Sequence, residues 1–448
     1  MKKILIPQMK VKALEYDVVV VGGGTGGVIA AIAASRQGAK TAIIESNGYV
    51  GGTAVEGGTA LHSFFNNYKE FGTEKKQIIK GIPDELIKKL VSAGACNGYD
   101  EMELGYCYES VCTVIDVEAY KTIAQRFLQD NGVDVYLSTT LCNVVKEDNK
   151  VIAAIAVAHN GQFAFTAKSF IDCSGYGDLC GYAGATVEFH NDQAVANSMG
   201  VAGVDVEKVY QQIVKEKATI REIVRNENKD EIYRLLATVF IDDWTPEGGK
   251  TQFLFTNLRN NYLMFVKANY KLDEPPMDPL VCSEANLILR EQQIKLLDAM
   301  KKRFDGFEHA FIARTAPKLL IRRGRWIDCD YVLTPEEICS GAHFEDDIAY
   351  YGFHDCAPRY NIAEGKDYGI PYRALLPKGL ENVYATGMMI SKEFLAHMST
   401  RNTVSCMAQG EAAGVAAAMC AKKDCTSREL PFAELKSELL KQGVYLGD

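Results

Sequence analysis

The sequence predicts an α/β fold with a central parallel sheet, a β-ribbon crossover and an inserted α+β cap domain. Two short apolar runs, Val18–Val21 and Thr41–Ile44, have the length of strands that are buried on both faces of a sheet. Between them lies an Ala- and Ile-rich stretch without proline, which reaches about Gln37 and ends at Gly38, as expected for a helix. Residues 184–310 carry mixed charge and lack the glycine-rich motifs found elsewhere, which indicates a separate region.

A glycine motif and an acidic residue frame this first strand–helix–strand unit. The spacing Gly-x-Gly-x-x-Gly suits a tight turn, the close approach of a pyrophosphate and its binding by unpaired N–H groups at the helix N-terminus. Glu45 ends the second strand, 23 residues after Gly22, where an acid can accept hydrogen bonds from ribose hydroxyls. The alternative, a glycine-rich surface loop, does not explain the buried strands on both sides. The unit therefore predicts dinucleotide binding by Gly22, Gly24, Thr25, Gly26, Gly27 and Glu45.

The composition argues against several other kinds of partner. A formal net charge of −9 at pH 7 disfavours nucleic acid or an anionic membrane as the main partner. No apolar run approaches the ~20 residues of a membrane span, and the apolar part of the N-terminal stretch is shorter than the ~7–15 residues of a signal-peptide core. We therefore expect a cytoplasmic protein. Its 13 cysteines form no Cys-x-x-Cys pair, so we interpret them as reduced side chains and predict no metal site.

A second glycine-rich turn follows Glu45 closely. Residues 45–54 read ESNGYVGGTA and are followed by Gly57-Gly58-Thr59. In this stretch the sequence resembles FAD-dependent oxidoreductases of the glutathione-reductase-like fold, which are distantly related to fumarate reductase flavoproteins. The resemblance implies a Rossmann-like FAD-binding domain in which backbone amides of this turn bind the pyrophosphate and small side chains leave room for the flavin. It adds to the cofactor site Ser46, Gly51, Gly52 and Thr53.

A β-ribbon and a third glycine-containing segment follow in the order that the resemblance implies. Strands at 151–158 and 163–167 are joined by Asn160-Gly161, a favourable type I′ turn. The next strand, Ser169–Asp172, leads into residues 173–178, CSGYGD, which are similar to the D-x-[ST]-G-x-G-D segment of the family. Its glycines would lie against the nucleotide; the alternative is a strand-ending turn with a locally bonded aspartate. We assign to FAD binding Cys142, Ser174, Gly175 and Asp178.

Residues 184–310 are predicted to form an inserted cap domain that covers the flavin and supplies walls for the substrate. The FAD-binding domain would then comprise residues 15–183 and 311–448, with its last sheet strand at 383–387. Within the cap we expect a helix over 204–237 with solvated charge runs, strands over 251–258 and 262–267, and a helix over 283–304.

Three arginines beside an apolar strand near residue 320 are candidates for binding an anion. On a strand, Arg322, Arg323 and Arg325 would alternate between two faces. The family has an R-[ED]-[ST]-R type of motif followed by Val-Leu-Thr, and Arg322, Arg325 and residues 332–334 match it, whereas Arg323 and Gly324 depart from it. A guanidinium can hold an anionic substrate or an FAD phosphate in a bidentate manner. Alternatively, these arginines are solvated or paired with acids at a strand edge.

The C-terminal part carries an Ala- and Gly-rich helix, predicted over residues 403–421 and capped by Asn402 or Thr403. Gly410 and Gly414 lie on one face and would let the helix pack closely on the sheet. In the family that the sequence resembles, the N-terminus of this helix points to the pyrimidine edge of the flavin and stabilises negative charge on the reduced ring. The resemblance thus places in the cofactor site Gly387, Asn402 and Thr403.

His397 and Arg401 precede this helix and are the main candidates for catalysis. Beside a flavin, a histidine could transfer a proton and an arginine could bind a substrate carboxylate or carbonyl. The alternatives are a histidine that fills a polar niche and an arginine paired with an acid. His62 and His354 are weaker candidates.

These features predict an FAD-dependent oxidoreductase that transfers a hydride or electrons between flavin N5 and a small, anionic or carbonyl-bearing metabolite. Arg401 with Arg322 or Arg325 would orient this substrate, and His397 would move the proton. One dinucleotide fingerprint is present, so the electron partner is the substrate, a loosely bound nicotinamide or another protein. The alternative from another class is a protein in which FAD is structural. Binding of NAD instead of FAD is disfavoured by the second glycine turn and by the Gly175 segment, and no motif indicates an oligomeric state.

Overall fold

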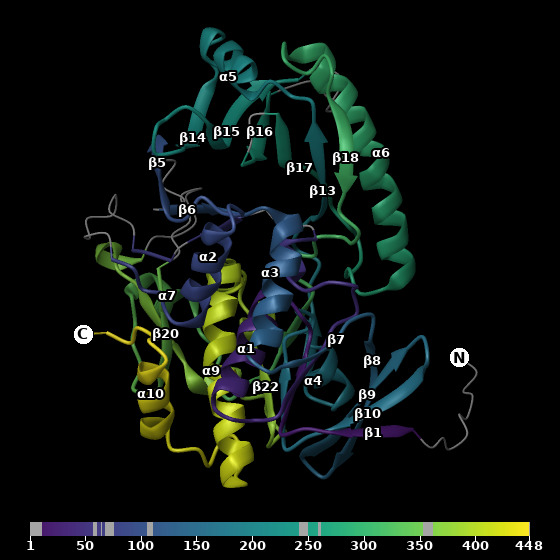
Figure 1. Cartoon of the computed structure of the whole chain (residues 1–448), viewed down its shortest axis with the longest axis vertical. Coiled ribbons are helices and arrows are strands. Elements are labelled where there is room, and N and C mark those ends of the chain that lie inside the picture. The colour runs from purple at the N-terminus through teal and green to yellow at the C-terminus, as the bar shows by residue number, and fades with distance from the viewer. Residues whose placement is uncertain are drawn as a thin grey trace.

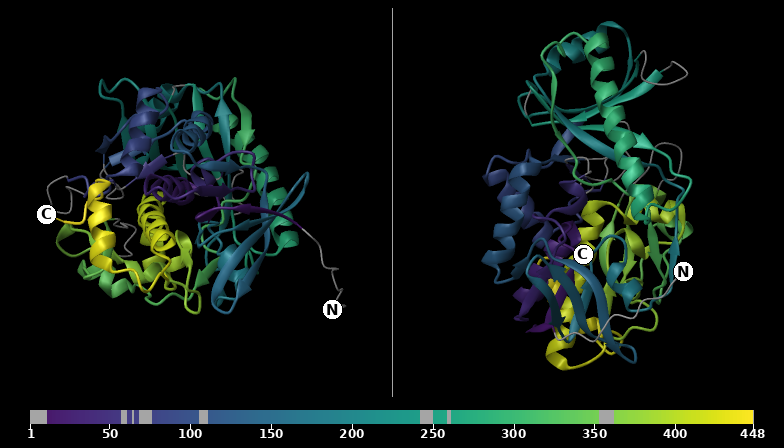
Figure 2. Two further views of the ribbon diagram at one scale, coloured as in Figure 1. Left: turned by 60° about the horizontal axis from the view of Figure 1, so that its bottom comes forward. Right: turned by 90° about the vertical axis from the view of Figure 1, so that its right-hand side faces the viewer.

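The computed structural model describes residues 11–56, 61–63, 65–67, 76–104, 111–241, 250–258, 261–352 and 362–447. Two of the motifs and candidates above, Gly57-Gly58-Thr59 and His354, lie outside these residues. The chain forms two lobes: a lower one with the long buried helix α9 at its centre, and an upper one bordered by α5 and α6 (Figures 1 and 2).

The lower lobe is built on a sheet of five parallel strands, which confirms the predicted fold class. Every residue of the central strand is a buried valine, as expected for a strand covered on both faces. The helix of the predicted strand–helix–strand unit is α1 (Thr25–Arg36), and Gly38 after it adopts a positive φ of 84°. The strand order is β22 (Val383–Ala385), β11 (Ser169–Asp172), β2 (Val18–Val21), β3 (Thr41–Ile44) and β7 (Asp134–Tyr136).

The predicted β-ribbon is present beside this sheet. Its two long strands pair antiparallel through a turn at Gly161, whose φ is 126°. Two further strands complete a sheet in the order β1 (Lys12–Glu15), β10 (Gly161–Thr166), β9 (Lys150–Ala158) and β8 (Thr140–Glu147). Further elements of this lobe include α2 (Ile82–Ser92), α3 (Val117–Asp130), α4 (Asp178–Tyr182), α7 (Pro335–Ser340), β20 (Asp347–Tyr351), β21 (Tyr368–Pro371), α8 (Phe394–Thr400) and α10 (Phe432–Lys441).

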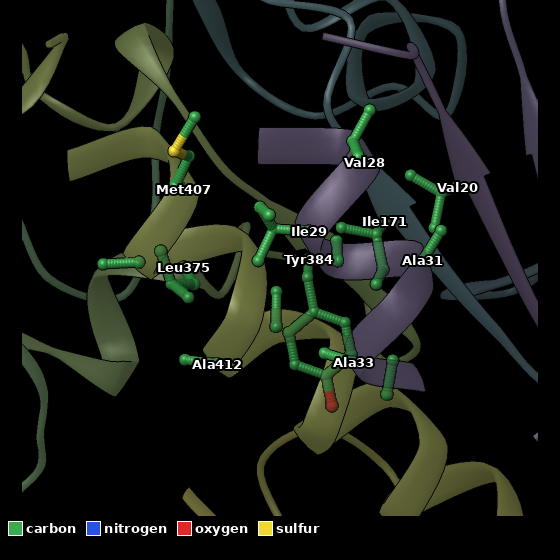
Figure 3. Packing of buried hydrophobic residues seen from close by; sticks show 14 of the residues in the cluster. Val20, Val28, Ile29, Ala31, Ala33, Ile171, Leu375, Tyr384, Met407 and Ala412 are labelled. Atoms are coloured by element: carbon green, nitrogen blue, oxygen red, sulfur yellow. The ribbon is translucent and has the colours of Figure 1, made fainter. Parts of the chain in front are cut away.

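The Ala- and Gly-rich helix α9 (Thr403–Lys423) packs against α1. Its glycines Gly410 and Gly414 were predicted to pack on the sheet, but they face α1 instead. A Cβ atom on Gly410 would lie 2.2 Å from the carbonyl oxygen of Gly26, and one on Gly414 would lie 2.2 Å from that of Ala30. The two helices therefore run in the same direction with their backbones in contact. Figure 3 shows side chains from both helices gathered in one core with strand residues Val20, Ile171 and Tyr384.

α9 also buries a carboxyl group against the start of α2. Glu411 is 1% exposed, and its Oε1 accepts a hydrogen bond from the backbone N–H of Ile82 (3.1 Å). Gly81 adopts a φ of 70°, and a Cβ there would lie 2.6 Å from Glu411 Oε1, so only glycine leaves room for the contact. Burial raises the pKa of Glu411 to about 8, because the charged form would lose its hydration.

The upper lobe contains two antiparallel sheets flanked by helices. The larger sheet includes strands from residues 61–114, and the smaller sheet includes β18, which follows residue 310. The upper lobe therefore contains residues from outside the predicted insertion, 184–310. The larger sheet has the order β16 (Lys250–Thr256), β15 (Ile232–Phe240), β14 (Thr219–Arg225), β5 (Asp100–Leu104), β6 (Val111–Val114) and β4 (Leu61–Ser63). The smaller sheet has the order β17 (Tyr262–Tyr270), β13 (Val195–Ala202) and β18 (Phe311–Thr315), and the helices are α5 (Val206–Lys215) and α6 (Pro279–Arg303).

Two local predictions were wrong. The helix expected over 204–237 ends at Lys215, and the rest of this range forms the hairpin β14–β15. The reason is the charged run NENKD (residues 226–230), which forms a turn. In this turn Asn226 Oδ1 accepts a hydrogen bond from Asp230 N–H (2.8 Å), and Lys229 has a φ of 64°. The arginine segment is a strand only over Arg325–Ile327, where β19 pairs with β12 (Val187–Phe189). Its arginines therefore do not alternate along one strand.

We predict that Gly414→Ala lowers the free energy of unfolding by about 1–3 kcal/mol, because the methyl group would push apart two helices whose backbones touch. Urea unfolding followed by circular dichroism measures this. Gly48→Ala is a matched control, since a Cβ at Gly48 meets only Ser138 Oγ, at 3.9 Å. Equal midpoints for Gly414→Ala and wild type would contradict the close crossing.

Glu411 should make stability depend on pH. Its pKa is raised from 4.5 to about 8 in the folded protein. Because Glu411 loses its proton at a lower pH in the unfolded chain than in the folded protein, its contribution to the free energy of unfolding is fully present below pH 4.5 and is lost as the pH rises towards 8. Glu411→Gln keeps an oxygen for the Ile82 N–H and removes the titration. Between pH 6 and 8, we expect the free energy of unfolding of the variant to rise relative to that of wild type by on the order of 1 kcal/mol per pH unit. Parallel stability–pH curves for the two proteins would refute this assignment.

Candidate active site

A cavity of about 260 Å³ lies at the carboxyl ends of the parallel strands, beneath the upper lobe. It gathers segments that are far apart in the sequence, including all three glycine-rich segments that fall within the described residues. Its lining comes from residues in the stretches 21–26, 44–47, 52–56, 139–141, 173–178, 318–322, 386–388 and 401–406.

The first glycine loop opens α1 towards this cavity. Gly22 has a φ of 101°, and a Cβ there would lie 2.4 Å from the carbonyl oxygen of Cys173, while a Cβ on Gly27 would lie 1.9 Å from that of Gly22. These two glycines therefore serve close packing. Gly24, Thr25 and Gly26 line the cavity at the helix N-terminus, which has no side-chain cap and no acidic residue in its first turn. Its N–H groups are thus left to an anion in the cavity.

Glu45 joins the first two glycine turns. Its Oε2 accepts a hydrogen bond from Gly23 N–H (2.6 Å) and its Oε1 accepts one from Asn47 N–H (2.7 Å). The turns also touch directly, since Gly51 N–H donates to Gly23 O (2.8 Å) and a Cβ on Gly52 would lie 2.8 Å from the Cα of Gly24. Glu45, Ser46, Gly52 and Thr53 line the cavity, whereas Gly51 lies behind it.

A buried aspartate organises the third segment. Asp172 is fully buried, its Oδ1 accepts from Ser174 Oγ (2.7 Å) and its Oδ2 accepts from Cys180 N–H (2.9 Å). Ser174 Oγ in turn accepts from Asp178 N–H (3.0 Å), so the serine hydroxyl holds the turn in shape. Ser174, Gly175 and Asp178 line the cavity as the resemblance implied. Asp172 begins the motif, but the sequence does not reveal its structural role, because its burial depends on packing.

Cys142 and Arg325 are among the predicted residues that do not line the cavity. Cys142 is half-buried in β8, where its thiol donates to Ile155 O (3.4 Å), and its neighbours Thr140 and Leu141 line the cavity instead. Arg325 pairs with Asp178 (3.3 Å) and does not line the cavity. Burial raises the pKa of Asp178 above its ordinary value, and the nearby guanidinium opposes this shift.

The start of α9 also lines the cavity, beside the start of α1. Thr403 lines it, and the first turn of α9 contains no acidic residue. Asn402 occupies the N-cap position, but its side chain donates to Met398 O (3.1 Å) and Ser399 O (2.9 Å) instead of capping the helix, contrary to the prediction. Gln409, which no motif indicated, accepts from Gly387 N–H (2.7 Å) and so holds that lining residue against the helix.

His397 is not part of the cavity lining. It is 1% exposed, with Nδ1 3.0 Å from Met388 O and Nε2 2.8 Å from Arg322 O. Burial lowers its pKa to about 3, and the charge of Arg401 adds to this. A neutral imidazole can donate to only one of these two oxygens, and it packs between two segments that do line the cavity. His62 is also buried, and its Nδ1 contacts Thr403 Oγ1 (2.8 Å).

Arg322 and Arg401 both line the cavity, at the end where α9 begins. Arg322 also donates to Asn269 Oδ1 of β17 (3.2 Å), which brings the upper lobe to this end. Lys318, Tyr176 and Glu56 line the cavity as well. Lys318 and Glu56 belong to no motif, and Tyr176 occupies a variable position of the third glycine-containing segment, so the sequence did not indicate them. Burial raises the pKa of Glu56, and the positive charge of Lys318 counteracts this.

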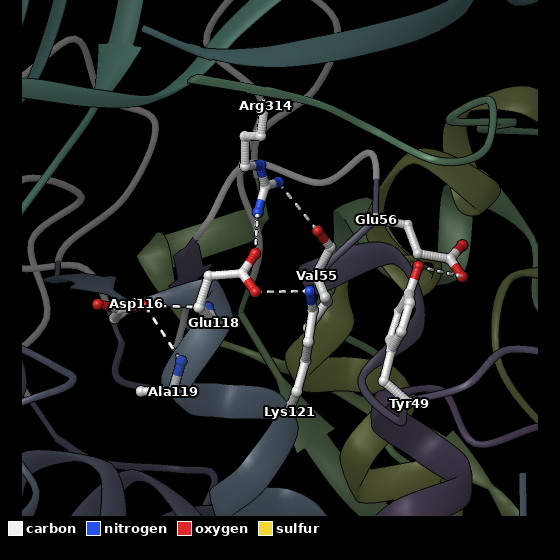
Figure 4. Close-up of polar contacts among 8 residues, drawn as sticks. All are labelled: Tyr49, Val55, Glu56, Asp116, Glu118, Ala119, Lys121 and Arg314. Carbon is white, nitrogen blue, oxygen red and sulfur yellow. Dashed lines mark hydrogen bonds and ion pairs between the residues drawn. The ribbon is translucent and has the colours of Figure 1, made fainter. Parts of the chain in front are cut away.

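The upper lobe is fastened to the lower one beside the cavity by Arg314 of β18 (Figure 4). Its guanidinium donates to Glu118 Oε1 (3.1 Å) and to Val55 O (3.1 Å). Glu118 is itself held by Lys121 (2.7 Å). Because Val55 adjoins Glu56 of the lining, this contact links the second glycine turn to the upper lobe.

A family profile described as FAD dependent oxidoreductase matches residues 17–439. The chain belongs to this family. Over 125 residues it is 32% identical to a dihydrolipoyl dehydrogenase of Acholeplasma laidlawii, and this alignment covers 27% of this chain and 32% of that protein. Over 206 residues it is 28% identical to a digeranylgeranylglycerophospholipid reductase of Thermoplasma acidophilum, covering 44% of this chain and 49% of that protein. The chain thus matches only about a third to a half of the length of these curated relatives.

Among solved structures, a geranylgeranyl bacteriochlorophyll reductase-like protein from Thermoplasma acidophilum is similar in fold. It aligns with a TM-score of 0.52 and 14% identity over 97% of this chain and 85% of that chain. At this level of identity the likeness concerns the fold alone. Within the described part of the chain, no helix is long and apolar enough to cross a membrane.

The cofactor of this oxidoreductase is FAD, and the cavity suits it. Two helix N-termini without side-chain caps, those of α1 and α9, open into one elongated space. The first would hold the pyrophosphate and the second would face an electron-rich edge of the flavin. Glu45 lines the same space and keeps acceptor capacity for ribose hydroxyls. When bound, FAD supplies a two-electron acceptor or donor.

We predict that Glu45→Ala weakens FAD binding by roughly 10–100-fold, since hydrogen bonds to a charged acceptor contribute about 1.5–3 kcal/mol and both glycine turns lose theirs. Titration of the FAD-free protein with FAD, followed by flavin fluorescence, gives the dissociation constant. Glu147→Ala on the exposed end of β8 is the control. Unchanged affinity in Glu45→Ala would show that the turns hold their shape without the acid.

Proposed function

We propose that the protein oxidises or reduces a small anionic metabolite that binds between the two lobes. The observation that carries this proposal is the placement of Arg322 and Arg401, which come from different segments and line the same end of the FAD cavity. A guanidinium binds a carboxylate through two parallel hydrogen bonds, which fixes both the position and the orientation of a substrate.

The supporting residues keep this end of the cavity in place. His397 packs between the backbone carbonyl groups of Arg322 and Met388, and Asn269 of the upper lobe accepts from the Arg322 guanidinium. The positive end of α9 lies beside Arg401, so the same region stabilises negative charge on a bound substrate or on the reduced flavin. Because the chain has one dinucleotide site, a separate electron donor or acceptor completes the reaction cycle in this proposal.

The test is an anaerobic screen of the FAD-loaded protein, monitored by the flavin absorption bands. Small carboxylates, including hydroxy and keto acids, should shift or bleach these bands, whereas their neutral amides should not. Arg401→Ala should weaken the response to an active carboxylate at least about tenfold, because a charge-assisted hydrogen bond is lost, while FAD content stays unchanged. Arg126→Ala, on the exposed face of α3, is the control. Equal responses to acids and amides, or loss of FAD in Arg401→Ala, would refute the assignment.

A further inference from the structure

Lys267 lies in the upper lobe, on the side of the small sheet that faces the cavity. It belongs to β17, where side chains alternate between the two faces. Its neighbours Val266 and Ala268 point the other way, into apolar clusters that include residues of α6. Asn269, two residues along and therefore on the Lys267 face, accepts the hydrogen bond from Arg322 of the cavity lining. The Lys267 face of β17 thus turns towards the arginine end of the cavity.

Lys267 is half-buried, and its surroundings are positively charged. Three guanidiniums act on its ammonium group, those of Arg322 and Arg401 from the cavity lining and that of Arg234 from β15. Within the described residues, Lys267 makes no hydrogen bond and no ion pair with a carboxylate, and its Nζ lies 5.8 Å from the centroid of the Phe265 ring. Burial and the repulsion by these three charges lower its pKa well below 10.5.

A hydroxyl group on the neighbouring strand also lacks a partner. Ser198 of β13 is the cross-strand partner of Lys267, so the two side chains lie next to each other on one face. Ser198 is 1% exposed, and its Oγ has no hydrogen-bond partner among the described residues. A buried hydroxyl without a partner is costly, which indicates that a group outside the described chain completes the site.

We propose that Lys267 and Ser198 form the upper-lobe side of an anion-binding subsite opposite Arg322 and Arg401, and that an anionic substrate group binds there together with a proton taken up by Lys267. This inference rests on the proposed function and adds the upper-lobe half of its substrate site. The physical reason is electrostatic. A bound anion cancels the repulsion among the cations and favours the charged form of the lysine, so protonation and anion binding strengthen each other.

Isothermal titration calorimetry of sulfate into the FAD-loaded full-length protein tests this coupling. Sulfate does not titrate near neutral pH, so any proton exchange comes from the protein or the buffer. Repeating the titration in two buffers of different ionisation enthalpy gives the number of protons taken up. We expect an uptake of about one proton per sulfate bound. Over the pH range in which Lys267 is neutral in the free protein, each rise of one pH unit should weaken sulfate binding about tenfold. A shift of the flavin absorption bands in step with binding would locate the anion in the cavity.

Lys267→Met should abolish the proton uptake and its pH dependence, while Lys271→Met, at an exposed position on the same segment, should behave as wild type. Sulfate binding without proton uptake by the wild-type protein would overturn the coupling but leave the anionic site standing. Proton uptake that persists in Lys267→Met would assign it to another group. If neither sulfate nor the carboxylates of the screen perturb the flavin, the proposed function itself fails. Should Lys267→Met not retain FAD, the wild-type titration in two buffers still decides the matter.

Discussion

The contact between α1 and α9 sets the position of the whole site. Gly410 and Gly414 let α9 approach until its backbone touches α1 at Gly26 and Ala30, and the helices run in the same direction. Their N-termini therefore open at the same edge of the parallel sheet, although almost 380 residues separate them in the sequence. A larger side chain at either glycine would separate the helices and with them the two ends of the cavity.

Around this contact, buried polar side chains fix the loops that line the cavity. Glu45 holds two glycine turns together, Asp172 shapes the turn at Ser174, and Gln409 fastens Gly387 to α9. Each of them satisfies backbone N–H groups that regular secondary structure leaves unpaired. These hydrogen bonds hold the loops around the cofactor cavity in shape. By contrast, the arginine end is formed by residues of both lobes, where contacts such as Arg314 with Glu118 hold the lobes together.

Charged side chains of opposite sign gather at different ends of the cavity. Glu45 and Glu56 lie by the glycine turns with Lys318 nearby, whereas Arg322 and Arg401 lie by the start of α9 and are joined by Lys267 of the upper lobe. Clustered cations repel one another, and their energetic cost falls when an anion binds. The proposed substrate end of the cavity would therefore favour negative charge more than a single arginine would.

The motifs predicted the fold class, and most of the residues that they assign to the cofactor line the cavity. This succeeded because the motifs are local: strand, glycine turn and helix lie within 30 residues, so spacing alone positions Gly24, Thr25 and Glu45. Residues that act through distant partners were not predictable in this way. His397 looked like a proton carrier beside the flavin helix, yet packing buries it between two carbonyl oxygens, and Arg325 pairs with Asp178 instead of facing the cavity. Lys267 and Ser198 belong to no motif. They become neighbours only because β13 and β17 pair, and they lie near the arginines only because this sheet faces the cavity. Local backbone chemistry can be read along the chain, whereas burial and the convergence of charges arise only from long-range packing.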